Sequence, residues 1–128
     1  MSTIISETQN NARERYKNRE PEHFFKDEHE LLLRRIGILE AIFLIELLQY
    51  FCAFAKNNML IDHPTHGIDW FPVSVQDLEE ALCLNGRRQK TIIRKLSSLN
   101  LIESQKFGTS SRRHFRINYE LVEKMEKL

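Results

Sequence analysis

The stretch NGRRQKTIIRKLSSL, residues 85–99, has two faces of opposite chemistry at the 3.6-residue period of an α-helix. Leu96 lies at the centre of one face with Ile92 and Leu99 beside it and Gln89 and Ile93 at its flanks, so we expect this face to pack on a core. The opposite face is polar and carries Arg87, Lys90, Thr91, Arg94 and Ser98. Arginines in the first turn stand at the positive end of the helix dipole, where each well-placed cation costs about 0.3–1 kcal/mol. Because local rules are often broken at functional sites, we interpret the stretch as a recognition helix, with a solvated charged face as the alternative.

Positive charge is concentrated around this stretch, although the chain of 128 residues has a formal net charge of only +1. Residues 85–117 hold nine Lys or Arg residues against one acidic residue, Glu103, whereas the parts before and after them are net acidic. A basic patch on a near-neutral protein attracts a polyanion without making the whole surface adhesive.

The sequence contains none of the short motifs that mark common catalytic or nucleotide-binding sites, so we expect neither an enzyme nor a cofactor. His63 and His66 stand three residues apart with Asp62 and Asp69 nearby, a spacing that a metal ion can use. Because Pro64 separates the histidines and no cysteine is near, a plain surface loop is the preferred interpretation and no metal site is expected.

The two cysteines and residues 1–10 indicate the cellular compartment of the protein. Cys52 and Cys83 lack CxxC spacing and lie in apolar helical surroundings, so we expect buried thiols in a reducing compartment. Residues 1–10 have neither a basic nor an apolar signal region. These features predict a cytoplasmic protein.

A long apolar segment follows Glu30, and Gly37 is expected to break it so that Ile38–Lys56 forms one continuous helix, with residues 31–36 as a turn or an extended lead-in. Glu40 then stands near the helix N-terminus, where a carboxylate is favoured. Charged residues within the span argue against a membrane helix. A small domain covers one face of such a helix, so we expect a homodimer through the other; the alternative is that loops and the N-terminal segment cover it.

The domain boundary is placed after residue 27. Residues 1–27 are polar and of mixed charge, with Pro21 interrupting any short helix, and predict a mobile arm that acts as a tether or binds a partner. Residues 28–128 are expected to form the folded domain.

A short helix is expected before the basic one. Residues 57–68 look like a loop and DWFPV, residues 69–73, like a short strand that Pro72 restricts to an edge or an end. Ser74 stands as N-cap three residues before Asp77. The apolar face of the helix that follows consists of Val75, Leu78, Ala81 and Leu82. Residues 84–86 then form a tight turn, in which Asn and Gly tolerate a left-handed backbone.

After the basic helix, residues 101–107 and 112–118 are expected to form two strands around a loop tip. In the second strand Phe115 and Ile117 alternate inward, while Arg112, His114 and Arg116 point outward. An amphipathic helix closes the chain with Leu121, Val122, Met125 and Leu128. The predicted fold class is therefore mainly α with a small β wing (α+β): a winged helix-turn-helix with a long apolar N-terminal helix.

Four segments within about residues 31–122, IGILEAIFLIELLQYF, DWFPVSVQDLEEAL, RRQKTIIRKLSSLNLIES and RRHFRINYELV, carry a resemblance to a known family. The chain resembles the winged helix-turn-helix domain of phage and plasmid replisome-organiser proteins, the DnaD-like replication group. The resemblance implies DNA binding in replication initiation and implies no catalytic residue.

The function expected from these observations is sequence-specific binding of double-stranded DNA, in replication initiation or transcriptional regulation. The alternative is a winged-helix module that binds an acidic protein, such as an anti-repressor or assembly scaffold. The candidate DNA-binding residues are Arg87, Arg88, Lys90, Thr91, Arg94, Lys95, Lys106, Arg112 and Arg113. Arg87, Lys90, Thr91 and Arg94 are assigned to the major groove, and the others to phosphates or the minor groove. A replication or regulatory protein is a further expected partner.

Overall fold

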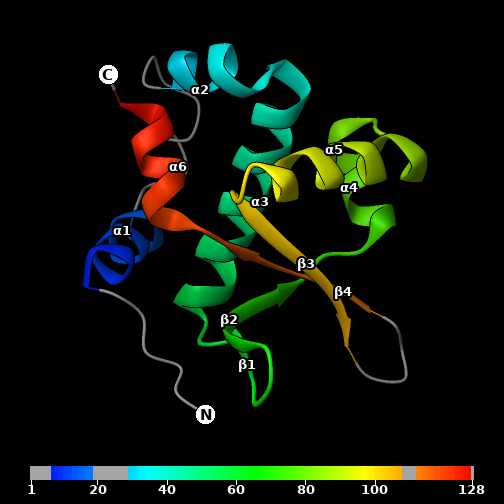
Figure 1. The fold of residues 1–128 in the computed structure, drawn as a ribbon. Helices are drawn as coiled ribbons and strands as arrows, with labels where there is room; N and C mark the ends of the chain where they lie inside the picture. Colours follow the sequence, from blue (N-terminus) through cyan, green and yellow to red (C-terminus); the bar gives the residue numbers. More distant parts are fainter. Residues whose placement is uncertain (1–6, 19–28, 108–111, 128) are drawn as a thin grey trace.

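The computed structural model describes residues 7–18, 29–107 and 112–127. Within these ranges, six helices and one four-stranded antiparallel sheet form an α+β fold. The helices are α1 (Glu7–Lys17), α2 (His29–Ile36), α3 (Ile38–Lys56), α4 (Val75–Leu82), α5 (Gly86–Ser98) and α6 (Tyr119–Glu126). The strands are β1 (Ile61–His63), β2 (Gly67–Pro72), β3 (Ile102–Phe107) and β4 (Arg112–Ile117). Figure 1 shows α3 in the middle of the fold, with α1 and α6 on one side and α4 and α5 on the other.

The long apolar helix α3 is the core of the fold, and it begins directly after Gly37 as expected. Gly37 has a φ of 106°, and a Cβ there would collide with the Glu40 carboxylate, so glycine is required at this break. The preceding residues form the helix α2 rather than the turn or extended lead-in that we expected. The apolar residues Leu32 and Ile36 of α2 are buried. A helix packed beside α3 covers more of the surface of α3 than an extended segment would.

Most of α3 is covered within the single chain. Ile45, a residue expected to face a partner subunit, is only 3% exposed, and α1, α2, α5 and β2 all pack against the helix. The expectation of an outward apolar face along the whole helix is therefore wrong. The large apolar side chains of α3 that remain exposed lie in its first turn, where Ile38 is 67% and Leu39 is 43% exposed.

The helix α3 is long and apolar enough to cross a membrane by length and composition, and half of its most apolar window is buried inside the protein. The core helix of a globular domain meets the same criteria.

Helix α1 corrects the prediction of a mobile arm over residues 1–27. It packs against α6 and α3, with Ala12 and Tyr16 fully buried. Arg13 Nε lies 2.5 Å from Asp69 Oδ2 on β2, and the Tyr16 hydroxyl donates to Glu126 Oε1 at 2.9 Å. Residues 7–17 are thus part of the folded domain, while residues 1–6 and 19–27 lie outside the described residues.

The sheet has the order β1-β2-β4-β3, and β4 pairs with β3 from Ile102 opposite Ile117 to Phe107 opposite Arg112. The two strands expected around residues 108–111 are both present, and Pro72 ends β2 as expected. The predicted loop over residues 57–68 is wrong in part, because it contains β1 and the start of β2. In the turn between them His63 Nδ1 accepts hydrogen bonds from the backbone N–H of Thr65 and His66.

One face of the sheet packs on α3, and the other is covered only in part. Phe71 and Phe115 pack toward α3, where the rings of Phe51 and Phe43 meet them. The other face holds the buried Trp70, whose Nε1 donates to the carbonyl oxygen of His66 at 3.2 Å.

Side chains of the β1–β2 hairpin cover the part of this second face around Phe107. The rings of His63, His66 and His114 all lie against Phe107, with centroids 4.6, 5.2 and 4.9 Å from it. His114 was expected to point into solvent, but it is only 7% exposed because the hairpin covers it. Within the described residues, no group of three or more His, Cys, Asp or Glu side chains is placed to hold a metal ion.

Candidate nucleic-acid interface

Helix α4 and the turn after it position the basic helix α5. The hydroxyl of Ser74 accepts a hydrogen bond from the backbone N–H of Asp77 at 3.0 Å, which confirms the predicted N-cap. Leu78 is buried as expected, but Val75 and Ala81, which we predicted on the same buried face, are exposed. The reason is that this short helix packs chiefly against α5, so a single narrow strip is covered.

In the turn between α4 and α5, the residue with a left-handed backbone is not one of those that the sequence indicated. Cys83, with a φ of 56°, ends α4 and is exposed, so the prediction that both cysteines are buried holds only for Cys52. Asn85 instead has an extended backbone and caps α5, because its side-chain oxygen accepts from the N–H of Arg88 at 3.0 Å. Gly86 is the first residue of α5.

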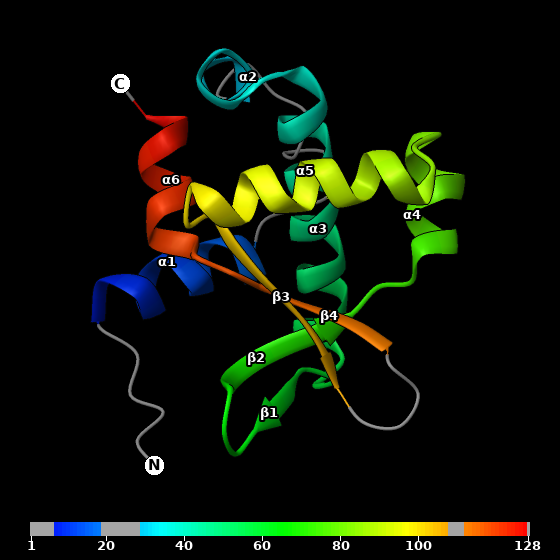
Figure 2. The same ribbon diagram turned by 45° about the vertical axis from the view of Figure 1, so that its right-hand side comes forward.

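The two faces of α5 are oriented as the sequence predicted. Gln89, Ile92 and Leu96 are buried against the core. The outer face of α5, by which we mean the exposed side chains between Arg87 and Arg94, consists of Arg87, Arg88, Lys90, Thr91 and Arg94. Figure 2 shows α5 crossing in front of α3, with the β3–β4 hairpin continuing directly from its end.

Six basic side chains of this region have no partner among the described residues. They are Arg87, Arg88, Lys90 and Arg94 on the outer face of α5 and Lys106 and Arg112 on the β3–β4 hairpin. Several bases elsewhere pair with carboxylates, as in the pairs Arg13–Asp69 and Arg116–Glu103, whereas Lys17 and Lys56 have no ion pair among the described residues. We call these six residues the exposed bases, and they leave uncompensated positive charge on two adjacent elements.

Two of the nine candidate residues turn toward the protein instead. Lys95 Nζ donates to the carbonyl oxygen of Ile36 at 2.9 Å and lies 3.6 Å from Glu40 Oε1, so it joins α5 to the α2–α3 junction. The Arg113 guanidinium donates from Nη2 to Gln89 Oε1 at 2.7 Å and lies 5.1 Å from the Phe115 ring centroid. Burial lowers the pKa of Arg113, although an arginine stays charged at neutral pH.

The residue that sequence reasoning missed is Gln89, which it placed at the flank of the buried face without a role. Gln89 is 0% exposed and its Nε2 donates to the carbonyl oxygens of Val75 at 2.9 Å and Leu84 at 2.8 Å. With the bond from Arg113, its amide joins α5 to the start of α4, to the turn and to β4. A single polar residue on an otherwise apolar helix face was the signal available.

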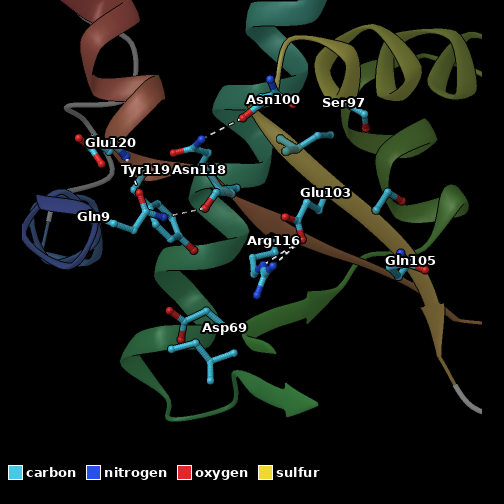
Figure 3. Close-up of a pocket in the computed structure, with 14 residues that line it drawn as sticks. Gln9, Asp69, Ser97, Asn100, Glu103, Gln105, Arg116, Asn118, Tyr119 and Glu120 are labelled. Carbon is cyan, nitrogen blue, oxygen red and sulfur yellow. Dashed lines mark hydrogen bonds and ion pairs between the residues drawn. The ribbon is translucent and has the colours of Figure 1, made fainter. Parts of the chain in front are cut away.

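A polar groove of about 750 Å³ lies on another side of the domain, between the end of α5, β3 and the start of α6 (Figure 3). Its polar side chains have partners within the protein: Arg116 pairs with Glu103 at 2.6 Å, and Asn118 Nδ2 donates to the backbone carbonyl oxygen of Asn100 at 3.1 Å. The residues that line the groove include none of the nine candidates, so the groove and the exposed bases are separate features.

Comparisons of this chain with protein-family models, with curated proteins and with solved structures find no match.

Proposed function

We propose that this chain is a sequence-specific double-stranded DNA-binding protein that acts in replication initiation or transcriptional regulation. The observation that carries the proposal is the set of exposed bases, which project from one helix and the hairpin that follows it without a carboxylate partner among the described residues. A phosphate backbone supplies the opposite charge along a line, and neutralising it releases counterions.

The order of the elements supports the same proposal. The order α3–β1–β2–α4–α5–β3–β4, with β2 paired to β4, contains the succession helix, strand, helix, helix and two-stranded hairpin that we expect of a winged helix-turn-helix domain, with β1 as an additional strand. In such a domain the second helix of the pair enters the major groove, which is about 12 Å wide and admits one α-helix. The resemblance of the sequence to replisome-organiser domains favours replication initiation.

In this proposal the candidate residues divide into three groups. Arg87, Lys90, Thr91 and Arg94 face the base edges of the major groove, where arginine pairs bidentately with guanine. Arg88, Lys106 and Arg112 contact phosphates beside it. Lys95 and Arg113 act within the protein, because their side chains are bound to Ile36 and Gln89.

A homodimer remains part of the proposal, but the surface available for its interface is smaller than the sequence predicted. The exposed apolar residues at the start of α3, Ile38 and Leu39, are the part of that helix left for a second subunit or for a replication or regulatory protein. The other large apolar side chains of the helix are buried or partly buried within the chain.

The experiment that tests the proposal is selection of bound sequences from a random duplex pool, followed by titration of the selected and of a random duplex at low salt. A specific protein enriches a sequence and binds it far more tightly than random duplex. If the protein binds neither, and instead retains an acidic protein partner, the alternative interaction module replaces this function.

A further inference from the structure

Two polar anchors hold α5 at different points along its length. Toward its C-terminal end Lys95 binds the carbonyl oxygen of Ile36. Near its N-terminal end Gln89 binds the carbonyl oxygens of Val75 and Leu84 and accepts the hydrogen bond from Arg113 on β4. Because Ile92 and Leu96 make only apolar contacts, which have no preferred direction, the anchors are the directional contacts of this helix.

We propose that the buried Gln89–Arg113 pair is a positioning device that sets the angle between α5 and the β3–β4 hairpin. The pair thereby selects DNA sites on which base contacts from α5 and phosphate contacts from the hairpin form together. This inference rests on the proposed function and adds to it the residues that create specificity without touching DNA.

The geometry makes the helix angle sensitive to this pair. A helix of 13 residues is about 20 Å long at a rise of about 1.5 Å per residue, so rotating it by about 5° about one end moves the other end by more than about 1 Å. Arg87 and Lys90 lie at the end that Gln89 holds. A shift of this size breaks a bidentate hydrogen bond to a base edge but leaves a long, flexible side chain able to reach a phosphate.

The burial of the pair separates this role from a direct contact. Gln89 is 0% exposed, and all three of its hydrogen bonds go to protein atoms. The Arg113 guanidinium is partly buried, with Nη2 bound to Gln89, Nε 3.4 Å from the carbonyl oxygen of Val73 and its plane over Phe115. Its neighbour Arg112 is exposed and has no partner among the described residues, so it serves as the matched control on the same strand.

The test compares Arg113→Met with Arg112→Met, using the affinities for the selected duplex and for a random duplex, the salt slope and urea unfolding. Arg113→Met is expected to lower the ratio of selected to random affinity about tenfold, while binding of random duplex falls no more than in the control. Arg112→Met is expected to weaken both duplexes equally and to reduce the salt slope by about one.

A second variant keeps the test independent of folding. Arg113→Lys retains one donor for Gln89 Oε1, so we expect a smaller loss of the affinity ratio, about threefold, in a stably folded protein. If Arg113→Met does not fold, Arg113→Lys is compared with Arg112→Lys, and equal ratios in those two variants overturn the inference.

Two other results also overturn the inference and leave the proposed function in place. One is an equal loss on both duplexes with a reduced salt slope in Arg113→Met, which makes Arg113 a phosphate contact. The other is an unchanged affinity ratio. Failure of the wild-type protein to bind any duplex is a different result, because it removes the proposed function itself.

Discussion

Arg13 on α1 and Asp69 on β2 form an ion pair with 2.5 Å between Nε and Oδ2, across 56 positions of the chain. Asp69 is buried and Arg13 is half-buried. Burial is the largest single effect and acts to lower the pKa of Arg13, but the hydrogen bonds that Arg13 donates to Asp69 and the nearby negative charges together outweigh it, so the pKa of Arg13 is raised overall. The pair joins the first helix to the central part of the sheet.

Replacing Asp69 by asparagine should destabilise the protein by about 1–3 kcal/mol, because the Arg13 guanidinium then keeps only the more exposed carboxylate of Glu14, its neighbour on α1. Asparagine has the same shape and tolerates the positive φ of 68° at this position, so the change removes the charge and little else. Urea unfolding measures the difference. The control is Arg34→Gln, which breaks the exposed Arg34–Glu30 pair and should stay within about 0.5 kcal/mol of the wild type.

Two isoleucines of α3 should respond in opposite ways to glutamate. Ile45→Glu places a charge in the core and should destabilise the fold by several kcal/mol or yield insoluble protein, whereas Ile38→Glu should fold normally because Ile38 is exposed. Circular dichroism during thermal unfolding measures both.

The same pair of variants tests the dimer. A dimer built on the start of α3 should sediment as a dimer in the wild type and as a monomer in Ile38→Glu. A wild type that sediments as a monomer at micromolar concentration removes the homodimer from the proposal.

Binding to duplex DNA should depend steeply on salt. Each neutralised phosphate contributes about −0.9 to the slope of log K against log salt, so the three bases assigned to phosphates, Arg88, Lys106 and Arg112, predict a slope of about −2.7 and a loss of about fortyfold between about 50 and 200 mM. Fluorescence anisotropy titrations at several salt concentrations give the slope. Affinity that stays constant over that interval contradicts the assignment of these bases to phosphates.

Alanine substitutions on the outer face of α5 and on the β3–β4 hairpin should have different effects on the affinity for DNA. Arg94→Ala should cost about 1–3 kcal/mol on the preferred duplex and much less on random duplex, because only base contacts distinguish the two. Lys106→Ala or Arg112→Ala should weaken both duplexes alike. If substitution of a hairpin residue instead abolishes the preference for the selected duplex, while Arg94→Ala retains that preference, α5 does not recognise the base sequence.

Glu46 on α3 should lower the stability of the fold as the pH rises, the opposite of the usual effect of a carboxyl group. Burial raises its pKa, and it has no ion pair among the described residues. A carboxyl group whose pKa is higher in the folded than in the unfolded state costs stability once it ionises, so its cost appears as the pH rises above about 4.5 and is absent below that value. Glu46→Gln should therefore stabilise the protein at pH 7 by less than about 1 kcal/mol, since the group is partly exposed and screened.

The matching control is the same substitution measured at low pH. Urea unfolding of wild type and Glu46→Gln at about pH 4 and pH 7 should show the gain only at the higher pH. A gain of equal size at both values would trace the effect to packing rather than to ionisation.

The sequence by itself determined the features that depend on neighbouring residues. The helical period placed Ile92 and Leu96 inward and Arg87 and Arg94 outward, and the alternation in β4 placed Phe115 and Ile117 inward. Ser74 and Gly37 marked helix starts because capping and a left-handed backbone are local requirements.

Tertiary structure decided which surfaces are covered and which polar side chains are bound. A period shows which face of a helix is apolar but not what lies against it, so the burial of Ile45 could not be derived from the sequence. Helix α1 is mostly polar, and it folds onto the domain through contacts with residues more than 50 positions away, such as Asp69. Lys95, Arg113 and Gln89 look like surface or flanking residues in the sequence, because nothing local distinguishes a long polar side chain that reaches water from one that reaches a distant carbonyl or amide oxygen.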